Sequence, residues 1–555
     1  IGEVDTPFDL KDKVKSAQLY ISCDNTFTAW INGQKVAQGA DWNNPVSVNV
    51  SKFMKANGSQ LLSIKGGNDN GNTAGLLVDL RVSLKNGKIL AIKSDGQWKW
   101  SRKVSKGWNK PGFNSKNWAN ANVSGAYGIS PWGKIGSGSK PSAPDNKKIS
   151  SGLEIAKGFK IEKIYDVPKS NQGSWVALTV GPDGKLLASD QGGMGLFEID
   201  VDSDGNLKSV EKLPIDISGA QGMTWAFDSL YAHVNGKGLY RAFDKDNDGQ
   251  LDSVEMLQGP NGGGEHGNHA VILTEDKQDL YVVAGNHTSV PKFIKKSRID
   301  MDWKEDLLLP RQWDARGHAR GRLAPGGWIA RINEEANDWE IVSIGYRNQY
   351  DVAINRHGDM FTYDADMEWD MGSPWYRPTR ICHVTSGSEF GWRSGTGKWP
   401  SYFEDSLPST VDIGPGCPTG VVFGTGAKFP AKYQDALYVL DWTFGTVYAT
   451  HLIPDGSSYK ATTEEFITGS PFPVTDAIVG HDGALYITVG GRGTQSALYR
   501  VTYTGPESTA PATGGLDEKT RLARSKRLRL EQWHRPDAPP AVKYIWPELS
   551  SSDRF

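Results

Sequence analysis

The sequence predicts an all-β protein that combines a jelly-roll β-sandwich, a six-bladed β-propeller and a short helical C-terminal tail. Three observations predict this fold. A twelve-residue loop motif occurs twice, 44 residues apart, a period typical of propeller blades. Short strands bounded by turn signals recur along most of the chain. The 64 glycines and 20 tryptophans suit a turn-rich β protein, and 555 residues exceed what a single core usually holds.

The segments follow in chain order. We expect the sandwich in residues 1–133, a Gly-, Ser- and Pro-rich linker over 134–150, the propeller over 151–504 and the helical tail over 505–555. Lys plus Arg (62) nearly balance Asp plus Glu (64), which gives no electrostatic basis for binding nucleic acid or an anionic membrane. No apolar run reaches the length of a transmembrane segment.

The first segment shows the alternation of half-buried strands, as in Phe27–Val36, where Asn32-Gly33 is a hairpin-turn dipeptide. It resembles the galactose-binding-like sandwiches attached to many glycoside hydrolases, through the segments Leu19–Ile21, Trp30–Gly33 and Pro131–Gly133. Its tryptophans either pack at the core and rim or stack on sugar rings: Trp42, Trp98, Trp100, Trp108 and Trp118.

The repeated motif has the ligand spacing of an EF-hand calcium loop, with glycine at the sharp turn. The expected ligands are Asp200, Asp202, Asp204, Asn206 and Glu211 in the first copy, and Asp244, Asp246, Asp248, Gln250 and Glu255 in the second. Strand-like segments flank both copies, so we expect calcium-clipped β-hairpins rather than helical EF-hands. Millimolar calcium outside the cell favours a periplasmic, secreted or cell-surface location.

Six apolar segments predict the inner strands of six blades. They begin at Trp175, Met223, Ala270, Asp351, Gly420 and Asp476, and four are followed by turn signals, at Pro182–Gly184, Glu275-Asp276, His357–Asp359 and His481–Gly483. In a four-stranded blade the turn between the third and fourth strands lies on the opposite face from the loop between the second and third. The calcium loops are therefore expected on the face away from the polar loops, in a structural role.

The polar loops are expected to converge on the mouth of the central channel, where propellers usually bind ligands. Two insertions, about 288–327 and 367–380, are expected to wall this mouth. The convergent residues include Gln221, Glu265, His266, His269, Asn286, His287, Arg347, Asn348, Asp441, Trp442 and Arg492. The histidines His269, His287 and His318 either bond to loop carbonyls or take part in catalysis or metal binding. The acidic residues Asp364, Asp366, Glu368 and Asp370 form either another calcium site or a solvated loop.

The pairs Glu265-His266 and Arg347-Asn348, with Val271–Asp276 between them, resemble the soluble pyrroloquinoline quinone (PQQ) glucose and aldose sugar dehydrogenases. The resemblance implies that His266 accepts the proton of a sugar or alcohol hydroxyl while hydride passes to the quinone. Glu265 is then expected to orient His266, and Arg347 and Asn348 to contact the quinone and substrate. Around the cofactor we expect Gln221, His269, Asp441, Trp442 and Arg492. Where the family has further cationic clamp residues, this chain has Thr443, Pro473 and Thr475.

Over most of its length the chain also resembles multidomain extracytoplasmic proteins of planctomycetes and verrucomicrobia, which join such a propeller to a HEAT-like helical region and a c-type haem domain. The segments that carry this resemblance are Glu265–His269, Ala284–Thr288, Arg347–Asp351, Glu389–Arg393 and Gly490–Gln495. It implies a haem domain or cytochrome as electron acceptor, although these residues contain no haem-attachment motif.

Two functions are consistent with these patterns. The first is a quinoprotein-like dehydrogenase that oxidises a sugar or alcohol at the channel mouth. The alternative is a non-catalytic, calcium-stabilised scaffold that binds glycan or another subunit; a glycan lyase or hydrolase lacks a defined carboxylate pair. The three cysteines form no disulfide framework, so Cys382 and Cys417 are either paired or free thiols.

Overall fold

The computed structural model describes residues 3–10, 12–40, 45–55, 58–67, 75–86, 88–103, 106–123, 152–300, 321–365, 377–393, 397–403, 406–533 and 541–555. The chain forms two compact units, Ile1–Ala143 and Pro144–Phe555. The predicted domain limits at 133 and 150 lie outside the described residues, as do Trp42 and Pro131–Gly133.

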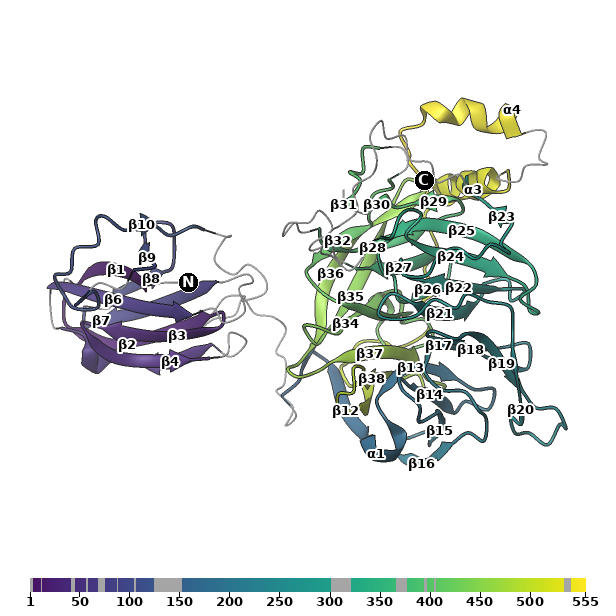
Figure 1. Ribbon diagram of the computed structural model, residues 1–555, viewed down its shortest axis with the longest axis horizontal. Coiled ribbons are helices and arrows are strands. Elements are labelled where there is room, and N and C mark those ends of the chain that lie inside the picture. Colours follow the sequence, from purple (N-terminus) through teal and green to yellow (C-terminus); the bar gives the residue numbers. More distant parts are fainter. Residues whose placement is uncertain are drawn as a thin grey trace. The chain divides into compact units, whose positions relative to one another are not determined.

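The N-terminal unit is a sandwich of two antiparallel sheets (Figure 1). One sheet has the order β10-β9-β1-β6-β3-β4, with β10 Ala119–Asn120, β9 Lys99–Ser101, β1 Glu3–Leu10, β6 Gly58–Gly67, β3 Thr26–Ile31 and β4 Gln34–Gly39. The other has the order β5-β2-β7-β8, with β5 Val46–Asn49, β2 Val14–Cys23, β7 Leu76–Leu84 and β8 Ile89–Lys93; η1 spans Ser51–Phe53.

Alternation of apolar side chains builds the core of this sandwich. Leu19 and Ile21 from β2 are fully buried with Leu62 and Ile64 from β6. The predicted hairpin turn joins β3 to β4, and Asn32 and Gly33 both have positive φ (51° and 84°), as a type I′ turn requires.

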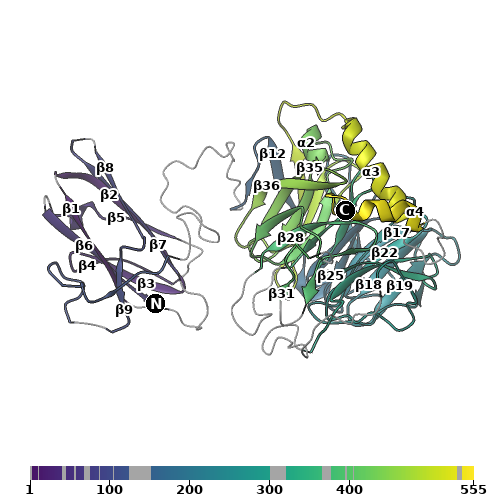
Figure 2. The same cartoon turned by 90° about the horizontal axis from the view of Figure 1, so that it is seen from above.

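The second unit contains six sheets that form the blades of a propeller (Figures 1 and 2). Blade 1 consists of β13 Trp175–Val180, β14 Leu186–Asp190, β15 Leu196–Val201 and β16 Leu207–Lys212. Blade 2 consists of β17 Ala220–Ala226, β18 Ser229–Val234, β19 Gly238–Phe243 and β20 Ser253–Met256. Blade 3 consists of β21 Asn268–Leu273, β22 Leu280–Ala284, β24 Gly327–Ile332 and β25 Trp339–Tyr346, extended by β23 Lys296–Ser297 and β29 Ser388–Glu389.

The other three blades complete the ring. Blade 4 consists of β26 Val352–Ile354, β27 Met360–Asp364, β28 Thr379–Val384 and β32 Val411–Gly414. Blade 5 consists of β33 Pro418–Phe423, β34 Leu437–Asp441, β35 Thr446–Asp455 and β36 Ser458–Thr468, extended by β11 Glu154–Ile155. Blade 6 consists of β37 Val474–Val479, β38 Leu485–Val489, β39 Ala497–Tyr503 and β12 Phe159–Asp166. A two-stranded ribbon, β30 Trp392–Arg393 and β31 Gly397–Lys398, and the single-turn helices α1 Lys169–Gln172 and α2 Ala431–Gln434 lie in the connections.

The first strands of successive blades contact one another around the whole ring, so the predicted all-β fold and its six inner strands are confirmed. The ring closes in blade 6, where β12, from before blade 1, pairs with β39 as the outermost strand. Bulky side chains fill the space between blades, and Trp175, Tyr231, Trp328, Tyr363 and Tyr438 are fully buried.

The C-terminal tail packs on the propeller as α3 (Glu518–Glu531), α4 (Ala541–Ile545) and η2 (Trp546–Ser550) (Figures 1 and 2). α3 lies within the helical tail predicted over 505–555. Asp517 caps α3, since its Oδ1 accepts a hydrogen bond from the Thr520 N–H at 2.9 Å. Arg524 and Arg527 both pair with the fully buried carboxylate of Asp359, in the turn between β26 and β27. None of the described helices is long and apolar enough to span a bilayer.

Candidate ligand-binding site

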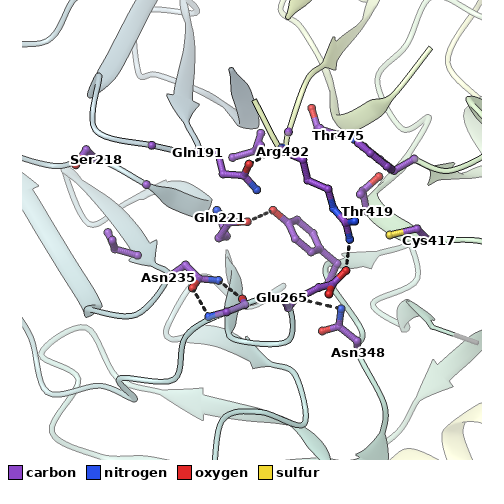
Figure 3. A pocket seen from close by; sticks show the side chains of 18 of the residues that line it. Gln191, Ser218, Gln221, Asn235, Glu265, Asn348, Cys417, Thr419, Thr475 and Arg492 are labelled. Carbon is purple, nitrogen blue, oxygen red and sulfur yellow. Dashed lines mark hydrogen bonds and ion pairs between the residues drawn. The ribbon is translucent and has the colours of Figure 1, made fainter. Parts of the chain in front are cut away.

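A cavity of about 610 Å³ lies at one end of the central channel and is lined by residues from all six blades. They come from the loops after the second strands and from the entries to the first strands, as predicted for the polar face. The polar and aromatic side chains that line it are Gln191, Ser218, Gln221, Asn235, Lys237, Glu265, Asn348, Tyr350, Cys417, Thr419, Trp442, Thr475 and Arg492 (Figure 3).

An ion pair joins opposite sides of this mouth. Glu265 enters blade 3, Arg492 lies in the loop after β38 of blade 6, and the Arg492 guanidinium pairs with Glu265 Oε1 (Figure 3). The main-chain N–H of Arg492 donates to Gln191 Oε1 at 2.5 Å, and its guanidinium lies 5.1 Å from the centroid of the Trp442 ring. Arg492 has φ +49°, so its backbone occupies the left-handed region.

Amide side chains hold the neighbouring loops. Asn235 bonds both backbone groups of Gly264, accepting from its N–H at 2.9 Å and donating to its carbonyl at 2.8 Å. This fixes the segment that carries Glu265. Tyr350 donates its hydroxyl hydrogen bond to Gln221 Oε1 at 2.6 Å, which links blades 4 and 2. Burial raises the pKa of Tyr350 well above its ordinary value, so this hydroxyl stays a donor.

Aspartates at the ends of the second strands hold the loops around the cavity. Asp190 accepts hydrogen bonds from the N–H groups of Ser174, Gly192 and Met194. Asp364 Oδ1 accepts from the N–H groups of Arg347 and Asn348 at 2.9 and 3.0 Å, and its Oδ2 pairs with Arg380.

Asp441, expected among the cofactor ligands, has the same structural role in blade 5. Its Oδ1 accepts from the N–H groups of Cys417, Thr443 and Phe444, and its carboxylate is buried below the cavity rather than lining it. Burial raises the pKa of Asp441 to about 6 despite these bonds. Trp442, Gln221 and Arg492 do line the cavity.

The expected proton acceptor, His266, is buried behind the mouth, with 3% of its surface exposed, and is not among the described residues that line the cavity. Its Nδ1 lies 2.7 Å from Asn286 Oδ1, and its ring lies against His287. Burial and the Arg347 charge lower the pKa of His266 well below its ordinary value, which leaves the ring neutral.

His269 and Arg347 are buried too. His269 Nε2 lies 2.7 Å from Asn348 Oδ1, and burial lowers its pKa to about 4. Arg347 is 6% exposed and does not line the cavity, whereas its neighbour Asn348 does. Of the predicted catalytic set, therefore, only Glu265 and Asn348 reach the cavity, and the roles of the others stay predictions.

The two calcium loops lie between third and fourth strands, on the face opposite the cavity. They differ from each other. In the second loop, carboxylate oxygens of Asp244, Asp246 and Asp248 lie within 4.8 Å of one another, as a hard cation requires. Glu255 instead pairs with Arg241, and Gln250 donates its N–H to Asp248 Oδ1 at 2.8 Å.

In the first loop, as in the second, backbone N–H groups of the loop bond to the carboxylates, but here a lysine also lies beside the first aspartate. Asp202 accepts hydrogen bonds from the N–H groups of Asp204 and Asn206, and Lys208 Nζ lies 3.5 Å from Asp200 Oδ1. Lys208 occupies the position that Asp252 has in the second loop. Glu211 lies on β16 opposite Glu198. The second loop thus fits calcium, and the first does so less well because the Lys208 ammonium competes for Asp200.

Several predictions fall outside the described residues: His318, Asp366, Glu368, Asp370 and most of both insertions. Cys23, Cys382 and Cys417 are free thiols, so the pairing alternative for Cys382 and Cys417 is excluded. Sequence reasoning missed Gln191, Ser218, Asn235, Lys237 and Thr419 as cavity residues. Their common signal is position, since each follows a second strand or lies just before or at the start of a first strand.

A bound PQQ, with its three carboxylates, would need a cationic clamp. Among the described residues, the cations lining the cavity are Lys237 and Arg492, and Arg492 is paired with Glu265. Thr475 lines it where the dehydrogenase family has a cationic residue. The described lining residues therefore lack the further cations of the dehydrogenase clamp.

Fold and site define a sandwich–propeller protein with a polar cavity at the channel mouth. No family model matches the chain. An α-L-rhamnosidase of Streptomyces avermitilis is 29% identical over 134 residues, which are 23% of this chain and 13% of the rhamnosidase. The chain thus matches only a small part of that relative's length.

Solved structures similar to the chain include soluble PQQ-dependent sugar dehydrogenases. The PQQ-bound aldose sugar dehydrogenase of Streptomyces coelicolor matches with 15% identity and a TM-score of 0.44, over 62% of this chain and 99% of that one. The PQQ domain of pyranose dehydrogenase from Coprinopsis cinerea matches with 14% identity and a TM-score of 0.47, over 65% and 99%.

Proposed function

We propose that the propeller binds a carbohydrate at the mouth of its central channel. The observation that carries this proposal is the composition of the cavity lining, in which amides and hydroxyls surround one indole. Gln191 and Gln221 suit a polyhydroxylated ligand through their NH₂ groups, since their Oε1 atoms accept from Arg492 and Tyr350. Asn235 and Asn348 also line the cavity, but Asn235 is bonded at both ends to Gly264, and Asn348 Oδ1 lies 2.7 Å from His269 Nε2. The apolar face of a sugar ring suits the Trp442 indole.

Binding without oxidation is the function that this site supports best. The expected base, His266, is buried away from the cavity, and the one carboxylate among the described lining residues, Glu265, is engaged by Arg492. A calcium-stabilised glycan-binding platform is consistent with these positions. Location outside the cytoplasm is a proposal that rests on the calcium-loop motifs, and association with a haem protein is one that rests on the sequence resemblance.

Calorimetric titration of the full chain with mono- and oligosaccharides tests this function. Trp442→Ala is expected to weaken sugar binding by about tenfold, because it removes the stacking surface. Trp546→Ala, which changes a 71% exposed tryptophan in the tail, is the matched control and should leave affinity unchanged.

The same titration with PQQ and calcium, followed by sugar-dependent dye reduction, tests the oxidoreductase alternative. We expect no quinone binding at tens of micromolar. Quinone binding with dye reduction that His266→Ala abolishes would replace the binding function with a dehydrogenase.

A further inference from the structure

Glu265 and Arg492 form a replaceable link across the cavity. Their blades are opposite each other in the ring, because the first strands β21 and β37 are three positions apart in the circle of six. The side chains are 44% and 56% exposed. Water screens a pair with this exposure, so it contributes little to stability and another carboxylate can take the place of Glu265.

Arg492 is held at the mouth independently of Glu265. Gln191 Oε1 fixes its backbone N–H, and the Trp442 ring lies beside its guanidinium, whose planar fork suits a bidentate carboxylate. Trp442 is fixed in turn, since its Nε1–H donates to the Gly490 carbonyl at 2.7 Å. Loss of the Glu265 contact therefore leaves a preorganised cation facing the cavity.

A second cation lines the same space. Lys237 projects from blade 2, in the loop after β18. If the Glu265 side chain leaves Arg492, the described lining residues contain two cations, Lys237 and Arg492, and no second carboxylate to pair with them. Amides and hydroxyls make up most of the remaining polar surface.

We propose that the ligand is an acidic saccharide, a uronate whose carboxylate displaces Glu265 from Arg492 while its hydroxyls bond to the cavity amides. This inference rests on the proposed carbohydrate-binding function and names the class of sugar. Glu265 then acts as an internal competitor: a neutral sugar leaves the link closed, whereas a uronate exchanges one guanidinium–carboxylate pair for another and opens it.

The test compares glucuronate and galacturonate with glucose and galactose by calorimetry at low and high salt. For the unmodified chain we expect uronates to bind about tenfold more tightly than the neutral sugars at low salt, with the difference shrinking as salt screens the pair. Glu265→Gln should strengthen uronate binding by about threefold, because it removes the competitor. Arg492→Gln should abolish the preference.

Asp338→Asn is the matched control. It breaks another exposed ion pair, Lys296–Asp338, which lies at a turn on the opposite face and has exposures of 62% and 53%. It should change no affinity. Equal binding of uronates and neutral sugars, or no effect of Glu265→Gln on uronates, overturns the inference and leaves the carbohydrate function standing. Failure of every sugar to bind overturns both.

Discussion

Asp364 anchors the mouth of the channel from within the protein, and its replacement by asparagine should destabilise the propeller strongly. The carboxylate is fully buried and serves two groups at once: the N–H groups of Arg347 and Asn348, and the guanidinium of Arg380. Asparagine keeps the shape but has one oxygen. Its NH₂ group must therefore face either the N–H groups of Arg347 and Asn348 or the guanidinium of Arg380, and all of these are donors as well.

The size of the expected loss of stability follows from the unpaired charge of Arg380 in the Asp364→Asn variant. Arg380 is 7% exposed, and without Asp364 its guanidinium keeps the carbonyls of Gly345 and Phe390 but no carboxylate partner among the described residues. Removing one partner of a buried ion pair costs about 3–5 kcal/mol. That is a large part of the 5–15 kcal/mol by which domains are typically stable. Binding of sugar should weaken too, because Asn348 lines the cavity.

Urea unfolding followed by tryptophan fluorescence measures the loss, since Trp175 and Trp328 are fully buried in the propeller. Arg380→Met should destabilise as well, and the double variant should lose less than the sum of the two, because it leaves no unpaired charge. Asp338→Asn, at an exposed pair, should change the free energy of unfolding by no more than about 0.5 kcal/mol. An Asp364→Asn effect equally small would refute the role assigned to Asp364.

Three further predictions concern other parts of the propeller. Calcium titration should show one strong site rather than two, and Asp246→Asn should remove it. A calcium concentration of 100 times Kd should raise the free energy of unfolding by about 2.7 kcal/mol. Two equal sites would contradict the difference between the loops. The buried histidines should each contribute a loss of propeller stability between pH 6.5 and 4, which the buried Asp351 and Asp441 partly offset because their pKa values are raised. Burial lowers the pKa of His233 to about 3 and those of His269 and His383 to about 4. Between pH 6.5 and 4 these histidines are therefore protonated in the unfolded chain but not in the folded one. As the pH decreases over this range, each histidine lowers the free energy of unfolding by at most roughly 1.4 kcal/mol per pH unit. The sandwich has no histidine and serves as the internal control; an equal response of both units would contradict this cause. Asp359→Asn should detach α3, because it removes the shared partner of two arginines, and trypsin should then cleave the helix faster; unchanged cleavage would show that other contacts hold it.

The blades could be predicted because each inner strand is a short apolar run next to a turn, a pattern set by neighbouring residues. Gly358 and Gly483, for example, have φ near +80° in turns between first and second strands, as glycine-containing turn signals suggest. The pairing of β12 with β39 could not be predicted, because two strands more than 300 residues apart carry no local sequence signal of their register.

The site was harder to predict than the fold. Glu265 and His266 are adjacent in sequence, yet one lines the cavity and the other is buried behind it, a difference set by contacts with Arg492 and Asn286 from elsewhere in the chain. Asp441 and Asp364 resembled ligands because both are acidic and each is the last residue of a strand that leads into a polar loop. Their real partners are backbone N–H groups, which a sequence does not display. The recurrence of aspartate at the ends of β14, β27 and β34 was the available signal.

Ring closure by β12 also bears on the biosynthesis of the chain. Phe159 pairs with Tyr503, so the outer strand of blade 6 is synthesised before blade 1 and waits for its partner until almost the whole propeller has been translated. Until then β12 has an unpaired edge that other nascent chains can join. A truncation that removes β39 would leave both β12 and β38 with such edges permanently. Ribosome-stalled chains that stop before and after residue 503 should therefore differ sharply in protease resistance, because only the longer one can close the ring.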